Sequence, residues 1–365
     1  MNKKMKNQNH SLERLFSKYY KKNKYITLNV PEVDCACVIP AWNEENYLPL
    51  TIEQLLKVKK DVNALIIVVL NHPVGADPEP QLRTLKYLES LNDKSIVPIY
   101  APNLTGGVGE ARKLGMDSFL FSQGENFADK IIFSLDADTL VEDDYFTCGM
   151  APFKDKNVSG AVLGYRHQDG NTLEETNAIR KYEDYLNYYV DNLRKANSPY
   201  AFHTIGSTFV VRGIDYLRCG GMRVKQAGED FYFLQALSKI GTIFNVEKVL
   251  CHPSCRVSNR VPFGTGPSMK SLLANEELEY IPLSCFEELK QVLLWAMEDK
   301  NLLNVLDRKT LLAPKSQLFL EQEKFFSSWN STIANQPDSK EARLKAFHIW
   351  FDGLKTLRFL HFMMK

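Results

Sequence analysis

Residues 131–138 read Ile-Ile-Phe-Ser-Leu-Asp-Ala-Asp, an apolar run that ends in two acids one residue apart. The run is short and does not alternate with polar residues, which is typical of a strand covered on both faces. Similar runs precede it at residues 35–39, 65–70 and 95–100. Helix-like stretches separate these runs at residues 45–60, 80–92 and 108–122. The alternation predicts βαβ units and a mostly parallel sheet.

The remaining chain predicts a second α/β region followed by helices. Strand-like and helix-like segments continue to residue 258, and the helical period dominates after residue 267. Residues 259–267 hold two glycines and two prolines, which predicts a loop that could act as a lid. The expected parts are a basic N-terminal segment at 1–30, an α/β domain at 31–258 with halves 31–140 and 141–258, the loop at 259–267, and a helical extension at 268–365.

Composition narrows the class of protein. The formal net charge of +1 argues against a nucleic-acid binder. Seven cysteines, an odd and scattered set, favour a reducing compartment over a disulfide framework, although Cys251 and Cys255 could belong to a zinc site. No apolar run approaches the ~20 residues of a membrane span, and no signal peptide is visible. We therefore expect a cytoplasmic protein.

The C-terminal residues 347–363 leave two interpretations open. They mix aromatic and aliphatic residues with Lys355, Arg358 and His361. An apolar face with basic flanks suits peripheral contact with the inner face of a membrane. Packing against the rest of the protein, or against a partner subunit, explains the same pattern and is the interpretation that we favour.

The two acids that follow the apolar run are the strongest functional signal. In an open α/β sheet, ligands bind beyond the carboxyl ends of the strands, which is where Asp136 and Asp138 are expected. Hard carboxylate oxygens suit Mg²⁺ or Mn²⁺, and such an ion can neutralise a departing diphosphate. The alternative is a pair of solvated loop acids.

Two further segments place polar residues near the same edge. Residues 38–45 read Val-Ile-Pro-Ala-Trp-Asn-Glu-Glu, where Pro40 is expected to stop a strand and Asn43 to cap the next helix. Residues 228–231 read Gly-Glu-Asp-Phe at a predicted helix start. The two acids there could simply favour the helix dipole, or one could serve as a general base.

Together these segments resemble family 2 glycosyltransferases of the GT-A fold, over about residues 33–255. Residues 38–45 match the family's opening motif, and residues 103–112 (Asn-Leu-Thr-Gly-Gly-Val-Gly-Glu-Ala-Arg) match its glycine-bearing segment. Residues 136–138 match its DxD motif. The acceptor-side segment is matched at residues 206–208, 220–221 and 228–230.

The resemblance implies a function and a set of site residues. It implies an enzyme that moves a hexose-type sugar from a nucleotide-sugar, with a UDP-sugar favoured, to an acceptor hydroxyl with inversion, in glycoconjugate or polysaccharide synthesis. Asp230 would be the base, with Glu229 as its neighbour and stand-in. The metal, Mn²⁺ or Mg²⁺, would be held by Asp138, Asp136 and His252, while a structural role for His252 is the alternative. The expected donor-binding residues are Pro40, Ala41, Asn43, Glu44, Asn71, Gly109, Arg112, Asp136 and Ala137.

The chain also departs from the family pattern. Where the family has an acid after its second strand, this chain has Asn71, which could still bond a uracil but makes the base preference less certain. The family asparagine after the arginine is Lys113 here, which we interpret as an ordinary helix lysine. Arg256 and Arg260, near the loop at 259–267, suit a lid that closes on phosphate oxygens, or a plain surface loop.

Two other functions compete with sugar transfer. A nucleotidyltransferase predicts a glycine-rich basic loop after the first strand, where this chain has Ala41-Trp42-Asn43-Glu44. A non-catalytic scaffold or partner protein would tolerate loss of the acids, all of which are present. The acceptor could be lipid-linked, a glycan or a small molecule.

Overall fold

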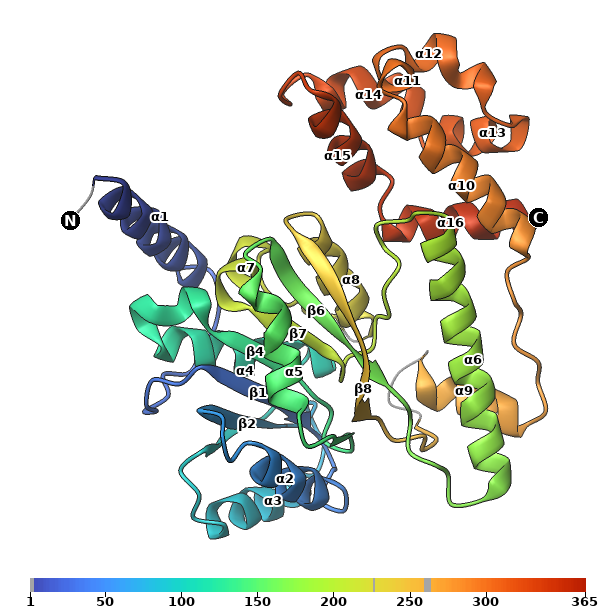
Figure 1. The fold of residues 1–365 in the computed structure, drawn as a ribbon. Helices are drawn as coiled ribbons and strands as arrows, with labels where there is room; N and C mark the ends of the chain where they lie inside the picture. The colour runs from blue at the N-terminus through green and yellow to red at the C-terminus, as the bar shows by residue number, and fades with distance from the viewer. Residues whose placement is uncertain (1–2, 226, 259–263) are drawn as a thin grey trace. The chain divides into compact units, whose positions relative to one another are not determined.

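The computed structural model describes residues 3–225, 227–258 and 264–365. The chain forms two compact units, Met1–Arg180 with Thr204–Asn275, and Lys181–His203 with Glu276–Lys365. The long helix α6 (Leu173–Lys195) contributes residues to both units. We call them the sheet unit and the helical unit and describe each by itself (Figure 1).

The described strands of the sheet unit form one mixed sheet in the order β3-β2-β1-β4-β7-β6-β8-β5. They are β1 (Cys35–Ala41), β2 (Ala64–Asn71), β3 (Ile96–Ala101), β4 (Ile131–Ser134), β5 (Leu140–Val141), β6 (Val158–Tyr165), β7 (Phe209–Arg212) and β8 (Thr242–His252). The first half is parallel, because β1 pairs with β2 and β4, and β2 with β3, in the same direction. The second half is mixed, since β7 runs antiparallel to both β4 and β6. The predicted α/β class and its parallel first half are confirmed.

Helices cover both faces of the parallel half. They are α2 (Leu48–Val58), α3 (Glu79–Ser90), α4 (Gly107–Ser122) and α5 (Tyr145–Met150), and short 3-10 helices follow α4 and α5 at η1 (Gly124–Asp129) and η2 (Ala151–Lys154). Alternate residues of β1, such as Cys37 and Ile39, share a buried cluster with Ile52 of α2 and Tyr145 of α5. The other face meets α4, where Gly115 allows the helix to approach Val38 closely. Coverage on both faces explains why these strands are apolar without alternation.

The acceptor-side part of the sheet unit carries three further helices. They are α7 (Gly213–Arg218), α8 (Glu229–Ser238) and α9 (Thr265–Leu273). Helix α8 contacts β6 and β8, so its first turn is placed by the sheet.

The N-terminal segment forms a helix that the sequence did not predict, α1 (Lys3–Tyr20). Its C-terminal end is tied to the buried Asp117 of α4. The Tyr19 hydroxyl donates to Asp117 Oδ1 at 2.8 Å, and Lys113 Nζ donates to Asp117 Oδ2 at 2.8 Å. Tyr216 of α7 donates to the same carboxylate. Lys113 is therefore part of a structural network, and because its side chain is only 14% exposed, the interpretation of it as an ordinary solvated helix lysine is wrong.

The helical unit has its own core. Beyond its part of α6 it contains α10 (Leu283–Met297), α11 (Asp299–Leu303), α12 (Val305–Arg308), η3 (Lys309–Leu311), α13 (Pro314–Gln322), α14 (Phe325–Ile333), α15 (Lys340–Trp350) and α16 (Gly353–Met364). The apolar residues of the C-terminal segment, including Phe347, Phe351 and Phe359, are buried in this core. They pack within the protein, which is the interpretation that the sequence favoured. No helix among the described residues has the length and apolar character that crossing a membrane requires.

Candidate active site at the carboxyl edge of the parallel strands

Polar side chains collect at one edge of the sheet because of strand direction. The parallel strands β1, β2 and β4 all end there, and the antiparallel β7 begins there. Strand β1 pairs with β2 on one side and β4 on the other, so this edge includes the point where strand order reverses. Such points are the usual ligand sites of α/β sheets.

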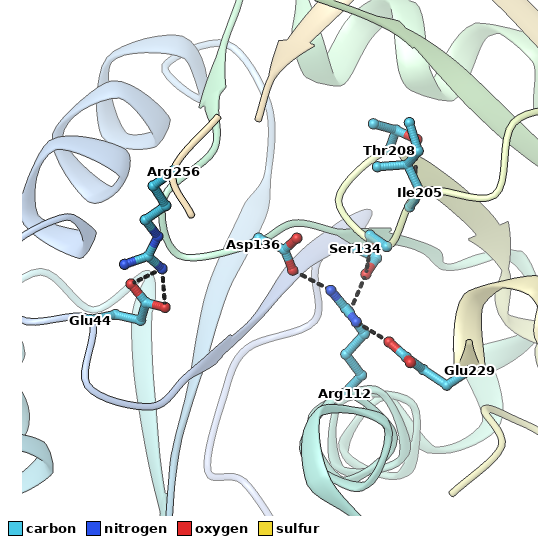
Figure 2. A network of polar contacts seen from close by, with 9 residues as sticks. Glu44, Arg112, Ser134, Asp136, Ile205, Thr208, Glu229 and Arg256 are labelled. Atoms are coloured by element: carbon cyan, nitrogen blue, oxygen red, sulfur yellow. Dashed lines mark hydrogen bonds and ion pairs between the residues drawn. The ribbon is translucent and has the colours of Figure 1, made fainter. Parts of the chain in front are cut away.

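Arg112 lies at the centre of this edge and links several polar groups (Figure 2). It projects from α4, and only 2% of its surface is exposed. Its Nη2 donates to Asp136 and its Nη1 to Glu229, so one guanidinium joins the acid after β4 to the acid that opens α8. Its Nε donates to Ser134 Oγ at 3.1 Å, and Ser134 donates in turn to the Gly206 carbonyl at 2.7 Å.

The electrostatics of this network keep it charged. Burial by itself lowers the pKa of Arg112, but the charges of Asp136 and Glu229 outweigh that effect and the pKa is raised. The sequence predicted Arg112 as a donor-binding residue. The structure places its guanidinium between two carboxylates, where it supports the acids that face the site. Gly206 is required here, because a Cβ on it would lie 2.6 Å from Arg112 Nη2.

Asp230 follows Glu229 in the first turn of α8 and has the properties of a base. Burial, followed by the charge of Glu229, raises its pKa to about 7. Its Oδ1 accepts a hydrogen bond from the Phe231 amide at 2.7 Å. A carboxyl with a pKa near the working pH can accept a proton and release it again, which is what general base catalysis needs. Glu229, by contrast, is buried and bound to Arg112.

Glu44 and Asp138 share a second guanidinium, that of Arg256. Arg256 Nη2 contacts both oxygens of Glu44, at 2.5 and 2.7 Å, and Arg256 Nε lies 2.7 Å from Asp138 Oδ2. The guanidinium also lies over the ring of Tyr47, 4.2 Å from its centre. Figure 2 shows Arg256 and Glu44 pointing toward each other. Glu44, in the turn between β1 and α2, and Asp138 are thus joined through the segment that follows β8.

His252 ends β8 and contacts a different acid. Its Nε2 lies 2.7 Å from Glu142 Oε1, and its Nδ1 lies 2.9 Å from the Arg166 carbonyl. The backbone of His252 is nevertheless close to that of Asp138, because Gln168 Nε2 donates to both carbonyls at 2.8 Å.

The side chains of the predicted metal ligands are of types that bind divalent cations, but each of them is paired with another protein side chain in this structure. Asp136 is paired with Arg112, Asp138 with Arg256, and His252 with Glu142. Among residues 3–225, 227–258 and 264–365, no three or more His, Cys, Asp or Glu side chains are grouped to hold a metal ion. Carboxylate oxygens are the ligands that Mg²⁺ and Mn²⁺ prefer, so Asp138 fits such an ion once Arg256 moves away.

The segment after β1 differs from expectation in two respects. Strand β1 continues to Ala41, one residue past Pro40, whose partner in β2 is Val69. Pairing with β4 ends earlier, at Val38, so the missing amide of Pro40 costs no bond on that side. The prediction that Asn43 caps the following helix is wrong, because α2 begins only at Leu48.

Asn43 instead forms a turn in the left-handed region, with a φ of 55°, which asparagine tolerates better than most residues. Its Oδ1 accepts a hydrogen bond from Gln81 Nε2 at 3.0 Å. The turn brings Glu44 back toward the sheet edge, where its side chain is buried. Ala137 belongs to the buried cluster of the sheet unit, and its carbonyl accepts a hydrogen bond from the Thr51 hydroxyl of α2.

Asn71 ends β2 at the same edge and is 94% buried, with 6% of its surface exposed. Within the described part of the chain, its side-chain amide makes no hydrogen bond. The next residue, His72, is held by two contacts. Its Nδ1 lies 3.1 Å from the Pro73 carbonyl, and its Nε2 lies 3.3 Å from the Tyr100 hydroxyl. A largely buried amide at a strand end of this edge is a candidate for reading a nucleotide base.

Gly109 lies where α4 meets the loop before α8. A Cβ on Gly109 would lie 2.7 Å from the Lys225 carbonyl and 2.8 Å from the Arg223 carbonyl. The two amides just before the helix are already occupied, because Glu110 Oε2 accepts from Thr105 and Gly106. In this arrangement Gly109 allows close packing of the loop, and its role as a donor-binding residue stays a prediction.

Several residues of the site were not predicted from the sequence. They are Ser134, Glu142, Gln168 and Tyr47, and they carry no motif of their own. Arg256 was predicted only as part of a lid, and its contacts with Glu44 and Asp138 depend on segments more than a hundred residues apart. The rest of that expected lid includes Arg260 and residues 259–263, which lie outside the described residues.

Comparison with known proteins agrees with the resemblance. Residues 36–213 match the family described as "Glycosyl transferase family 2". Among curated proteins, no relative matches the chain.

Solved structures give more distant likenesses. S. aureus TarS 1–349 in complex with UDP-GlcNAc is 13% identical, with a TM-score of 0.46, over 87% of this chain and 89% of that one. The mannosyltransferase PcManGT from Pyrobaculum calidifontis, in complex with GDP-Man and Mn²⁺, is 14% identical, with a TM-score of 0.43, over 96% of each chain. The M. tuberculosis glucosyl-3-phosphoglycerate synthase in complex with Mn²⁺, UDP-glucose and glycerol 3-phosphate is 16% identical, with a TM-score of 0.39, over 66% and 78%. Because these likenesses are distant, the proposals below rest on the family match and on the site's own residues.

Proposed function

Because residues 36–213 belong to glycosyl transferase family 2, we propose that this chain transfers a hexose-type sugar from a nucleotide-sugar to an acceptor hydroxyl, with inversion at the anomeric carbon. The observation that carries the proposal is the single guanidinium of Arg112, which joins Asp136 on the donor side to Glu229 beside the candidate base. It joins the acids of two distant motifs through one buried guanidinium.

In this proposal Asp230 accepts the proton of the acceptor hydroxyl. The acceptor oxygen forms its bond to the anomeric carbon as the bond from that carbon to the diphosphate breaks, and the electron pair leaves with the diphosphate. Asp230 is suited to this task because burial and Glu229 raise its pKa to about 7. Glu229 is bound to Arg112 and acts on Asp230 through its charge, so we assign the base role to Asp230 alone.

Asn71 is proposed to read the nucleotide base. Its amide oxygen can accept a hydrogen bond and its NH2 group can donate. Such a pair matches the N3–H and an adjacent carbonyl of uracil, and we propose a UDP-sugar as the donor. Guanine presents a similar pair at N1–H and O6, so the comparison of UDP with GDP tests this preference. Glu44, Pro40, Ala41 and Asn43 lie at the neighbouring strand end and are proposed to complete the pocket.

The departing diphosphate requires positive charge. Mn²⁺ or Mg²⁺, held by Asp138 and Asp136, would supply that charge as a Lewis acid. His252 is a proposed further ligand, and the Gln168 bridge keeps its backbone close to that of Asp138. The acceptor class (lipid-linked, a glycan or a small molecule) stays a prediction from the sequence. The same holds for the cytoplasmic location and for peripheral contact with a membrane.

Calorimetric titration of UDP and of GDP, with and without Mn²⁺, tests the donor site. We expect UDP to bind more tightly than GDP and Mn²⁺ to strengthen the binding. Asp138→Ala should lose the metal effect but keep its fold, because the residue lies at the sheet edge. Failure of both nucleotides to bind to well-folded protein would refute the proposed donor site and favour the scaffold function.

A second measurement tests transfer itself. Release of UDP from UDP-sugars, with water or a sugar as acceptor, should be detectable for the wild type and should fall about 100-fold or more in Asp230→Asn, since a general base contributes that much. Unchanged release in that variant would show that Asp230 is not the base.

A further inference from the structure

We propose that Arg256 holds the cation position of the donor site before a donor binds, and that Arg256 and a divalent cation compete for Asp138. This inference rests on the proposed function, because it concerns the same site. It adds a residue and a mode of regulation that the family match does not supply.

The contacts of Arg256 are those of a bound cation. Its guanidinium is held by the two carboxylates of Glu44 and Asp138 at 2.5–2.7 Å, and it faces the ring of Tyr47. An arginine guanidinium is not deprotonated in proteins, so the group between these carboxylates is a cation. Charge-assisted bonds of this kind are the strong ones in proteins.

The same carboxylate cannot serve both cations in the same way. Arg256 Nε lies 2.7 Å from Asp138 Oδ2, which places a positive group directly against this carboxylate. A divalent ion at Asp138 would meet both steric overlap and charge repulsion from the guanidinium. Binding of a metal at Asp138 therefore requires the side chain of Arg256 to leave.

The structure allows the side chain to leave while the backbone stays in place. The segment that carries Arg256 is anchored by the buried Cys255 and by the bond from Gln168 to the His252 carbonyl. The Arg256 side chain itself is 23% exposed, so it can rotate into solvent. Once released, the guanidinium stays near the site and can bind the diphosphate oxygens of the donor. Arg256 would thus pass from the carboxylates to the diphosphate as the donor enters.

The test measures binding of Mn²⁺ alone to the full chain, from the loss of the electron paramagnetic resonance signal of the free ion. Arg256→Gln removes the charge but keeps a donor for the buried Glu44. We expect it to tighten Mn²⁺ binding about ten-fold, the value of one competing charged contact. Arg83→Gln is the matched control, because Arg83 makes a similar paired contact with Glu45 at the surface.

Further variants separate competition from general charge effects. Adding Asp138→Asn to Arg256→Gln should abolish the gain. Arg256→Lys, whose ammonium cannot bridge both carboxylates, should tighten Mn²⁺ binding less than the glutamine variant does, and it serves as the test if Arg256→Gln does not fold.

Equal Mn²⁺ affinity in the wild type and the Arg256 variants, including no measurable binding to any of them, would overturn the inference. An equal gain in Arg83→Gln would also overturn it. Titration of UDP and GDP into the same proteins tests the proposed function separately. A difference in Mn²⁺ affinity without nucleotide binding would keep the competition and refute the donor site, and the reverse pattern would refute only the competition.

Discussion

The charge of Glu229 should set the pH at which the enzyme becomes active. Asp230 must be ionised to accept a proton, and its pKa is raised to about 7 by burial and by Glu229. With that pKa, the ionised fraction falls from about one half at pH 7 to about one tenth at pH 6. An ordinary aspartate would stay ionised over this range. The kcat/KM of the wild type should therefore fall about five-fold between about pH 7 and pH 6.

Glu229→Gln removes the neighbouring negative charge while keeping the size of the side chain. The carboxylate of Asp230 then loses a repulsion, and Arg112, which lowers its pKa, has one acid fewer to pair with. Both changes lower the pKa of Asp230, so the acidic limb of the pH profile should move down by about one pH unit. Burial acts in both proteins, so the limb should stay above the range of an exposed aspartate.

The assay is the pH dependence of kcat/KM for UDP release, measured with whichever nucleotide-sugar the binding titrations select. Circular dichroism at each pH serves as the control for unfolding. A limb that stays in place in Glu229→Gln, or that moves to higher pH, would refute the reasoning. Survival of the same limb in Asp230→Asn would show that another group titrates.

Three further changes test the scaffold around the site. Arg112→Gln should lower the free energy of unfolding by about 3–5 kcal/mol, because it leaves two carboxylates without their buried partner, and urea titration measures this. Gly109→Ala should displace the backbone at Arg223 and Lys225 and cost about 1–3 kcal/mol, visible as a lower Tm and a lower kcat, and an unchanged Tm would count against the close packing. Tyr19→Phe removes a hydroxyl that donates to Asp117 and should cost about 1–3 kcal/mol, whereas the exposed Tyr25→Phe should change stability little.

The strands and helices around the site were predictable because their pattern is local. Apolar runs mark β1 to β4, and glycine and proline mark the breaks between them. The acids of the DxD motif and of α8 were found because each lies at the end of a predicted strand or the start of a predicted helix, which is where α/β sheets bind ligands. The fold class followed from the same pattern, since strands that alternate with helices favour a parallel sheet.

The helix α1 was missed for a related reason. Its first residues are mostly basic and polar, and its attachment depends on Tyr19 reaching Asp117, which is 98 residues away. The capping prediction for Asn43 failed because a left-handed turn satisfied the residue instead, and that turn is stabilised by Gln81 from α3. Neither bond can be seen in a short window of sequence.

The amino-acid order alone therefore identified which elements form and which acids lie at their ends. It could not decide how the charges pair, because pairing depends on distance in space and not along the chain. Only the tertiary structure placed Arg112 between Asp136 and Glu229, and Arg256 between Glu44 and Asp138. Buried charges require partners, so packing the sheet edge decides which cation each acid receives. In the proposed function, this choice of partners separates Asp230, the base, from Glu229, which is paired with Arg112. It also means that Asp138 must release Arg256 before it can bind a metal ion.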